Sequence, residues 1–405
     1  MKTQSVCGNF GPRIRSDCEI SIRLADSGGI QIDLESKVER LHGISIRNLI
    51  HDGLNTFGIP DAQIMIRDSG ALPFVISARL EAAVRLLKDD TTEFLPEMIN
   101  QTGPSSSRDQ FRFSRLYLPG NTPSMMLNAG IHKPNGIILD LEDSVAPQKK
   151  HEARYLVRNA LRQIDFMGAE RMVRINQLPD GIEDVKCIVP HFVDLILLPK
   201  CEHPEQVQII EKELHRLSEG HTTNLPWIMP IIESALGIEN AFEIARASKY
   251  IVAMAVGLED YTADIGVQRT LSGHESHYAR TRLVNACKAA GIQPIDSVFS
   301  DVSDQDGLTS SVMESKALGF EGVGCIHPRQ IPVIHEAFQP SSAEIEKAQK
   351  VVYAYEKANK QGLGVVSLGT KMIDAPVVKR AQQTINLALQ LQLIRSDWMD
   401  QMPNE

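Results

Sequence analysis

Eight short apolar runs, each followed by a stretch with helical periodicity, fill the middle of this chain. They lie at residues 115–118, 136–140, 172–175, 195–198, 227–232, 251–256, 292–298 and 322–326. The runs are almost continuous in apolar residues, which is typical of parallel strands that are buried on both faces. About eight strand–helix units in roughly 230 residues is the composition of a (β/α)8 barrel. The sequence therefore predicts an α/β fold with a TIM barrel at residues 111–338.

Segments of a different character flank the predicted barrel. Residues 91–110 combine Gly, Pro, Ser and charged residues without periodicity, which indicates a linker. The preceding residues, 1–90, alternate between strand and helix patterns and predict a small α+β domain. Residues 339–405 predict a C-terminal helical extension. The expected elements of these flanks are strands at 18–24, 30–34 and 62–67, a segment at 74–77 after a turn, and helices at 45–56, 78–87, 342–362 and 375–394.

Composition places the chain among ordinary globular proteins and argues against some partners. Its 405 residues are 42% hydrophobic and 23% charged, which is enough for a large core and two or three domains. A net charge of -9 disfavours binding to nucleic acid or to an anionic membrane. No apolar run reaches the roughly 18 residues that span a bilayer, and residues 1–12 lack the apolar core of a signal peptide. The six cysteines show no metal-binding spacing and are expected to be reduced thiols, so a cytoplasmic enzyme is predicted.

Charged side chains follow the predicted strands at the end where TIM barrels carry their active sites. Several carboxylates with few His or Cys residues favour a hard cation such as Mg²⁺, and Glu233 and Asp260 on neighbouring strands are the best candidate ligands. A single acid at such a place could equally be a helix cap or an ion-pair partner. Several acids together require a positive charge among them, because like charges repel. The strand-end residues are Asp140, Glu142, Asp143, Arg174, Lys200, Glu233 and Asp260.

A series of short motifs along the barrel occurs in an informative order. They are RLYLPGN (115–121), LDLEDSV (139–145), VRIN (173–176), LLPK (197–200), IIESALG (231–237), GLEDYTADIG (257–266), GFEGVGCIHPRQ (319–330) and MIDAPVV (372–378). Together, over residues 113–387, they resemble the citrate lyase β-subunit and malyl-CoA (citramalyl-CoA) lyase family. Each motif is weak alone, and the ordered set is specific.

This resemblance implies a role for each matching residue around a magnesium ion. Glu233 and Asp260 match the family's Mg²⁺ ligands, and Arg174 matches the arginine beside the metal. Glu142 and Asp143 match acids near the metal and its waters. A permanently charged guanidinium at Arg174 suits the stabilisation of an enolate or a keto acid.

Two further residues are implied by the resemblance to lie around the substrate. Arg115 matches a residue that lines the channel for the thioester and its carrier. Asp374 matches an acid on the C-terminal segment that reaches a neighbouring subunit's site, which implies a homotrimer or a hexamer built from two trimers. Asp374 suits proton transfer at carbon. Its alternative is a helix N-cap ahead of Ala375.

The N-terminal residues, from about 32 to 87, resemble the citrate lyase γ-subunit, an acyl carrier protein. The matching stretches are SKVERLHGISIRNLI (36–50) and DSGALPFVISARLEAA (68–83). The resemblance implies a CoA-derived arm on Ser16 and, as a partner, an acyl transferase like the citrate lyase α-subunit. The family's usual Gly after this serine is absent. Ser16 could therefore be an ordinary turn residue, with free CoA carrying the thioester.

The predicted function is Mg²⁺-dependent cleavage of a 3-hydroxyacyl thioester into a keto acid and an acetyl-type thioester. Citryl, citramalyl and malyl groups all remain open as the acyl part. One alternative is an aldolase on free hydroxy-keto acids, for which Lys200 could form a Schiff base; an ion pair of Lys200 with an acid of the same rim is favoured instead. A second alternative is a non-catalytic carrier or scaffold subunit of an acyl-transfer complex.

Overall fold

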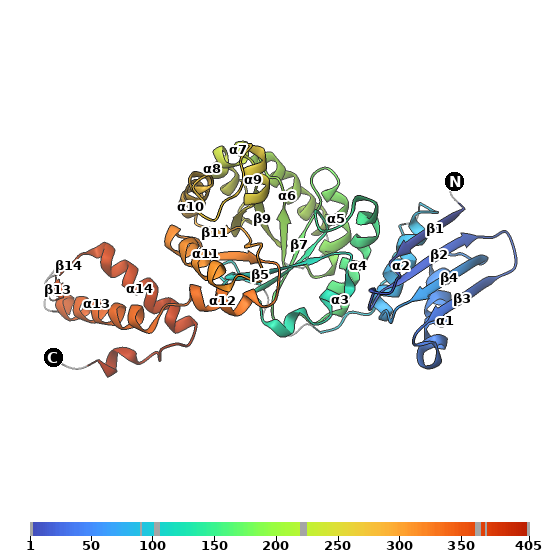
Figure 1. Cartoon of the computed structure of the whole chain (residues 1–405), viewed down its shortest axis with the longest axis horizontal. Helices are drawn as coiled ribbons and strands as arrows, with labels where there is room; N and C mark the ends of the chain where they lie inside the picture. The colour runs from blue at the N-terminus through green and yellow to red at the C-terminus, as the bar shows by residue number, and fades with distance from the viewer. Residues whose placement is uncertain are drawn as a thin grey trace. The chain divides into compact units, whose positions relative to one another are not determined.

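The computed structural model describes residues 3–89, 91–100, 106–218, 225–360, 366–368 and 371–402. The chain divides into two compact units, Met1–Ile331 and Pro332–Glu405, and each is treated by itself below. Figure 1 shows the strands and helices of both units. The domain boundaries expected at residues 90, 110 and 338 stay predictions.

The larger unit contains the predicted TIM barrel. Eight parallel strands form a closed barrel, in which the last strand pairs with the first (Figure 1). The strands are β5 (Ser114–Pro119), β6 (Gly136–Asp140), β7 (Glu170–Arg174), β8 (Leu195–Leu198), β9 (Trp227–Ile232), β10 (Ala253–Val256), β11 (Gln293–Asp296) and β12 (Gly322–Cys325). Each coincides with one of the eight apolar runs, with ends that differ by at most two residues.

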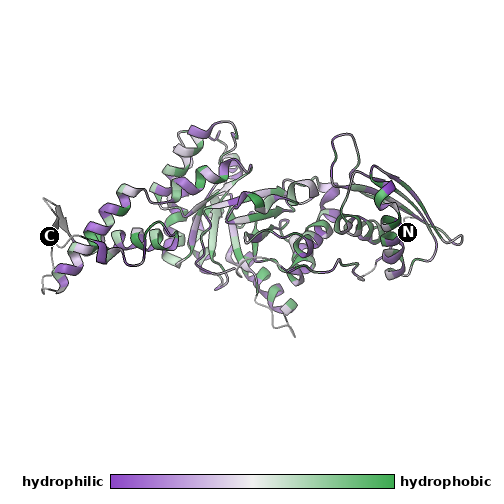
Figure 2. Ribbon diagram, turned by 90° about the horizontal axis from the view of Figure 1, so that it is seen from below, coloured by the Kyte–Doolittle hydropathy of each residue, from purple (hydrophilic) through white to green (hydrophobic). Residues whose placement is uncertain are grey.

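Helices follow the strands and cover the outside of the barrel. They are α3 (Pro123–Met126), α4 (Lys150–Gln163), α5 (Gly181–Ile188), α6 (Pro204–Ser218), α7 (Ala235–Glu239), α8 (Ala241–Ala245), α9 (Leu258–Asp264), α10 (His277–Ala290) and α11 (Gln305–Leu318). Helix α12 (Gln330–Phe338) follows β12 along the chain and lies mostly in the second unit. Figure 2 shows that these helices carry both hydrophilic and hydrophobic residues, whereas the strands are mostly hydrophobic. Inside the barrel, residues from successive strands, such as Ile138, Met172, Leu197 and Met229, pack into one buried cluster. This core fixes the strand ends and therefore the positions of the side chains that follow them.

The N-terminal part of the same unit is a four-stranded sheet with two helices. The sheet order is β1-β2-β4-β3, with antiparallel β1–β2 and β2–β4 pairs and a parallel β3–β4 pair. The elements are β1 (Gln4–Gly8), β2 (Cys18–Leu24), β3 (Ile30–Ser36), α1 (Glu39–Thr56), β4 (Ala62–Asp68) and α2 (Pro73–Arg85). The small α+β region was predicted. Strand β1 was not, and α1 begins six residues before the predicted start at residue 45.

The segment 74–77 is also different from the prediction, because it forms the first turn of α2. Pro73 lies in the first turn, where the missing N–H of proline costs no hydrogen bond. Every residue from Phe74 to Val84 is buried, so the helix is covered on all sides. Residues 91–100 of the predicted linker form neither helix nor strand, and its residues 101–105 lie outside the described part of the chain.

The second unit is the predicted helical extension. Helices α13 (Ser342–Lys360) and α14 (Ala375–Gln390) pack together around Val352, Ile385 and Trp398. A short antiparallel hairpin of β13 (Val366–Leu368) and β14 (Lys371–Ile373) was not predicted. The predicted ends of the first helix, residues 361–362, lie outside the described residues. Among the described helices of the whole chain, none is both long and apolar enough to cross a bilayer.

Candidate active site

Charged residues that end or follow β6, β7, β9 and β10 lie around one cavity of about 400 Å³ at the C-terminal rim of the barrel. Asp140 and Arg174 are the last residues of β6 and β7, and Glu233 directly follows β9. Asp260 lies in the first turn of α9, after β10. The structure therefore brings together Arg115, Asp143, Arg174, Glu233 and Asp260, which the sequence selected separately.

Lys200 links the two predicted metal ligands. Its backbone N–H donates to Glu233 Oε2 at 3.0 Å, and its Nζ donates to Asp260 Oδ1 at 2.8 Å. Lys200 has a φ of +47°, a left-handed conformation that is uncommon for a residue with a side chain. Strained backbone of this kind persists where the surrounding structure requires it. This conformation holds the carboxylates of Glu233 and Asp260 on one side of the rim.

Glu233 is a buried carboxylate among other acids. Its pKa is raised to about 7, chiefly by burial, and the nearby charges of Asp260 and Glu142 act in the same direction. The Lys200 N–H and Arg174 oppose this shift. Gly257 faces this carboxylate so closely that a Cβ atom there would lie 2.5 Å from Glu233 Oε1. A glycine at this position keeps the space around the carboxylate open.

Arg174 supplies the positive charge that a group of acids requires. Its Nε and Nη2 donate to the two carboxylate oxygens of Asp140, both at 2.7 Å. Its Nη1 lies 2.9 Å from Glu142 and 3.4 Å from Asp143. The guanidinium also lies 5.4 Å from the ring centroid of Tyr117. Burial would lower the pKa of Arg174, but the bonds with Asp140 outweigh it and raise the pKa.

Glu142 is buried and only partly satisfied. Its Oε1 accepts from Gln177 Nε2 at 3.0 Å. Its Oε2 is the atom near Arg174 Nη1, but the angle does not make a hydrogen bond, so this oxygen has no hydrogen-bond partner among the described residues. Burial raises the pKa of Glu142. A buried oxygen of this kind indicates a water molecule or an ion beside it.

These residues fit a magnesium ion. Mg²⁺ is commonly held by one or two carboxylates and keeps several water or substrate oxygens. Among the described residues there is no group of three or more His, Cys, Asp or Glu side chains arranged around one point, as a closed protein cage would need. Glu233 and Asp260, with the Glu142 carboxylate nearby, provide the smaller set that Mg²⁺ accepts.

Arg115 lies beneath the rim and is fully buried. Its Nη1 is 3.2 Å from Met229 Sδ and its Nη2 is 3.5 Å from the Asp296 carbonyl oxygen. Its Nε has no partner among the described residues. Burial lowers the pKa of Arg115, although an arginine remains charged in proteins. The cavity therefore has a buried positive charge at its base.

Three predicted residues are not among those that line this cavity: Glu142, which contacts the lining residue Arg174, and Asp374 and Ser16. Asp374 lies in the second unit, where it is exposed and caps α14 by accepting from the Val377 N–H at 3.1 Å. Asp374 thus makes the N-cap hydrogen bond, and its role in proton transfer stays a prediction. Ser16 lies in the N-terminal part, just before β2, with a φ of +56°, and its N–H donates to the Ser69 carbonyl oxygen at 3.1 Å.

Asp140 is the site residue that the sequence analysis left without a role. It is buried, and it also accepts from the N–H groups of Glu142 and Ser144 at 3.0 and 3.1 Å. Bonds with Arg174 outweigh the effect of burial and lower its pKa. The pairing register of the strands could have predicted this contact. Asp140 and Arg174 are the last residues of the neighbouring parallel strands β6 and β7, and they are direct partners in the register.

The closed barrel with charged residues at its C-terminal rim defines a TIM-barrel enzyme. Residues 114–328 match the family model for HpcH/HpaI aldolase/citrate lyase. Residues 3–87 match the acyl carrier (ACP) model described as malonate decarboxylase delta subunit (MdcD). The chain belongs to the HpcH/HpaI aldolase/citrate lyase family, and it is a carbon–carbon lyase.

Curated relatives cover most of the chain. Citrate lyase subunit beta of Leuconostoc mesenteroides subsp. cremoris is 38% identical over 295 residues, which are 72% of this chain and 98% of that subunit. Mitochondrial citramalyl-CoA lyase of Homo sapiens is 32% identical over 328 residues, 77% of this chain and 96% of that enzyme. Both resemblances inferred from the motifs, to the β-subunit and to a carrier protein, are confirmed.

A solved structure shares the fold. The protein CitE of Mycobacterium tuberculosis, in complex with magnesium, acetoacetate and coenzyme A, has a TM-score of 0.58 and 28% sequence identity. The match covers 70% of this chain and 99% of CitE. Magnesium, a keto acid and a CoA molecule therefore bind together in a structural neighbour of this lyase.

Proposed function

We propose that this chain cleaves a 3-hydroxyacyl thioester of the citryl, citramalyl or malyl type, with Mg²⁺, into a keto acid and an acetyl-type thioester. One observation carries the proposal: Glu233, Asp260 and Arg174 line the same cavity. Both carboxylates also accept a hydrogen bond from Lys200. Two carboxylates beside a fixed guanidinium suit a reaction that separates a keto acid from an enolate. The magnesium, acetoacetate and CoA bound by CitE support this choice.

Glu233 and Asp260 would hold the cation, and Glu142 and Asp143 would hold its water molecules. When bound, magnesium supplies Lewis-acid polarisation of the oxygens of the departing keto acid. The charge of Arg174 stabilises the negative oxygen that develops as the carbon–carbon bond breaks. Asp140 keeps the Arg174 guanidinium in one orientation through two hydrogen bonds. Arg115 lines the route of the thioester at the base of the cavity.

Asp374 would move the proton at carbon from the C-terminal segment of a neighbouring subunit. Its exposed position at the start of α14 supports this role, because a side chain that serves another subunit must be accessible. The proposal includes a homotrimer or a hexamer. Light scattering that finds only a monomer would remove the shared site.

The thioester would be carried on a CoA-derived arm at Ser16, with free CoA as the alternative carrier. The match of residues 3–87 to an acyl carrier model supports the arm. An acyl transferase like the citrate lyase α-subunit would then load it. Intact-mass spectrometry of the natively expressed chain distinguishes the two carriers. An arm adds its mass to the wild-type chain, and the Ser16→Ala variant lacks this added mass.

A second candidate is an aldolase that acts on free hydroxy-keto acids through a Schiff base at Lys200. The pKa of Lys200 weighs against it: burial would lower this pKa, but the ion pair with Asp260 outweighs burial and raises it. A protonated ammonium is a poor nucleophile. A third candidate is a carrier or scaffold without catalysis. Such a protein does not require the buried cluster of Arg174, Asp140 and Glu142 beside the cavity.

The test is keto-acid release from citryl-CoA, citramalyl-CoA and malyl-CoA with Mg²⁺. We expect release from at least one of them and its loss in Asp260→Asn. The matched control is Asp264→Asn, since Asp264 is an acid of the same helix, α9, and accepts from the Ala235 N–H instead. Activity only on free hydroxy-keto acids would favour the aldolase. Absence of release together with no Mg²⁺ binding by calorimetry would favour the scaffold.

A further inference from the structure

Helix α2 lies between the N-terminal sheet and the barrel and contacts both. Helix α2 packs on the sheet with one face and on the barrel helix α4 with the other (Figure 1). Phe74, Val75, Ala78 and Ala82 are all buried between these layers. Separation of the two parts would expose this apolar face to water, which opposes separation.

A buried ion pair and two hydrogen bonds to the backbone of Gly8 cross the same interface. Arg158 of α4 donates to Glu81 of α2 at 2.9 and 2.6 Å, and both side chains are fully buried. Glu152 of α4 accepts from the Gly8 N–H at 2.5 Å, and Lys149 donates to the Gly8 carbonyl oxygen at 2.7 Å. Such contacts have strict geometry, so they fix one relative orientation of the sheet and the barrel.

A third set of contacts connects the turn that holds Ser16 with the barrel rim. Arg79 is fully buried and forms two hydrogen bonds with Asp17, the neighbour of Ser16, at 3.0 and 2.9 Å. The same guanidinium donates to Asn121 Oδ1 at 2.6 Å. Asn121 follows β5, two residues beyond its last residue, Pro119. Ser16 is therefore held close to the C-terminal end of a barrel strand.

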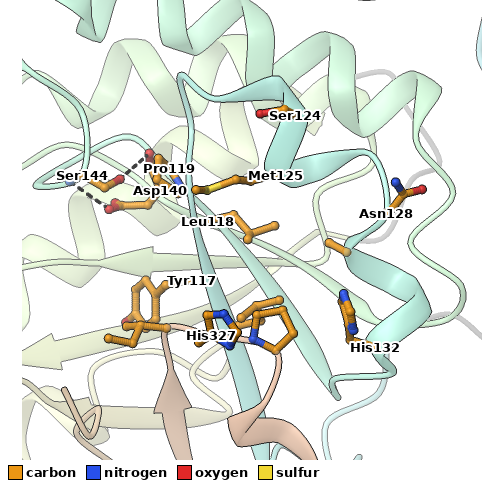
Figure 3. Close-up of a pocket in the computed structure, with 14 residues that line it drawn as sticks. Tyr117, Leu118, Pro119, Ser124, Met125, Asn128, His132, Asp140, Ser144 and His327 are labelled. Carbon is orange, nitrogen blue, oxygen red and sulfur yellow. Dashed lines mark hydrogen bonds between the residues drawn. The ribbon is translucent and has the colours of Figure 1, made fainter. Parts of the chain in front are cut away.

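A second cavity lies beside the segment that contains Asn121 and adjoins the rim cavity. Figure 3 shows its lining, in which Pro119 and Ser124 flank the segment that contains Asn121. The cavity has about 500 Å³ and is lined mainly by apolar groups such as Leu118 and Met125. Tyr117, Asp140, Ser144 and Ile326 line both this cavity and the rim cavity. The two cavities thus adjoin, and a flexible arm with a small polar end fits such a route.

We infer that the carrier-like part does not swing between partners for the cleavage step but is fixed on its own barrel, and that the arm of Ser16 serves the rim of the same chain through the cavity beside β5. This inference rests on the proposed function, since it requires the arm. Arg79 acts as a positioning residue that links Asp17 to Asn121. The arm alone moves, while the Ser16 turn and the rim keep their places.

The first experiment uses two chains with complementary defects. Ser16→Ala has an intact rim without an arm, and Glu233→Gln has an arm without a working rim. Intact mass first establishes the arm on the wild-type and Glu233→Gln chains. If the wild-type chain carries no arm, the carrier part of the proposed function has failed, and this inference falls with it.

With the arm established, keto-acid release from the acylated arm is measured for each variant alone, for the mixture and for the co-expressed pair. Delivery within one chain predicts that the mixture and the co-expressed pair are as inactive as either variant. Activity in either sample would show that an arm reaches the rim of another chain, and it would overturn the inference.

The second experiment separates positioning from folding. Arg79→Gln is compared with Arg47→Gln, which changes an arginine of α1 that bonds to Glu39 rather than to Asp17. We expect Arg79→Gln to lower turnover of the carrier-bound thioester by roughly tenfold to a hundredfold, with turnover of the free CoA thioester retained. Arg47→Gln should change neither. Equal losses on both thioesters, or no loss on the carrier-bound one, would contradict the positioning role.

Discussion

The backbone N–H of Lys200 donates to Glu233 at 3.0 Å, and it does so from a left-handed conformation with a φ of +47°. Through this contact, the backbone conformation after β8 sets the position of the Glu233 carboxylate, which follows the neighbouring strand β9. Because the Lys200 side chain bonds to Asp260, one residue organises both acids. The Lys200 side chain and backbone can therefore orient both carboxylates.

The first prediction concerns the side chain of Lys200. In Lys200→Met the backbone contact with Glu233 remains and the ammonium is lost. We expect Mg²⁺-dependent keto-acid release to persist, with a loss smaller than the ~100-fold expected when a proton-transfer group is removed. Borohydride treatment with a keto acid should leave no adduct on the wild-type chain by mass spectrometry. A trapped adduct on Lys200 would contradict this account.

The second prediction concerns the orientation of Arg174. Asp140→Asn removes the charge that holds the guanidinium in its two-point contact, and it should lower kcat by about a hundredfold. Asp143→Asn should cost less, because Asp143 is exposed and lies 3.4 Å from Arg174. Circular dichroism of both variants controls for folding. Equal losses in the two variants would mean that the Asp140 contact has no special role.

The apolar runs predicted the barrel strands because parallel strands buried on both faces need continuous apolar sequence. They could not predict that Lys200 adopts a left-handed conformation, since this depends on Glu233, 33 residues further along the chain. The same holds for the interface of α2 with α4. Arg158 and Glu81 are 77 residues apart, and only the tertiary structure brings them into contact.

The third prediction tests that interface by stability. Arg158→Met leaves Glu81 in a buried site without its cross-interface partner, which should lower the free energy of unfolding by about 3–5 kcal/mol. The double variant Arg158→Met/Glu81→Leu should recover much of the loss. The control Arg216→Met breaks an ion pair with Glu213 whose arginine is exposed, and it should cost about 0–1 kcal/mol. Urea titration measures all three, and equal effects of Arg158→Met and Arg216→Met would refute the prediction.

The fourth prediction concerns the thiols. Burial raises the pKa of Cys7, Cys187, Cys201 and Cys325 to about 12 in each case. It also raises the pKa of Cys18 and Cys287. A thiol reagent at pH 8 should therefore react slowly with the folded chain and should titrate six thiols after denaturation. Rapid reaction of two or more thiols in the folded chain would be inconsistent with this burial.

The central claim is that carbon–carbon cleavage depends on a divalent cation held by Glu233 and Asp260. The most direct measurement is the rate of keto-acid release by the wild-type chain in EDTA and during titration with Mg²⁺, beside the Glu233→Gln variant. We predict no release in EDTA, recovery with Mg²⁺, and a loss of more than about a hundredfold in the variant at saturating Mg²⁺. Release that persists in EDTA, or a variant as active as the wild type, would contradict the claim.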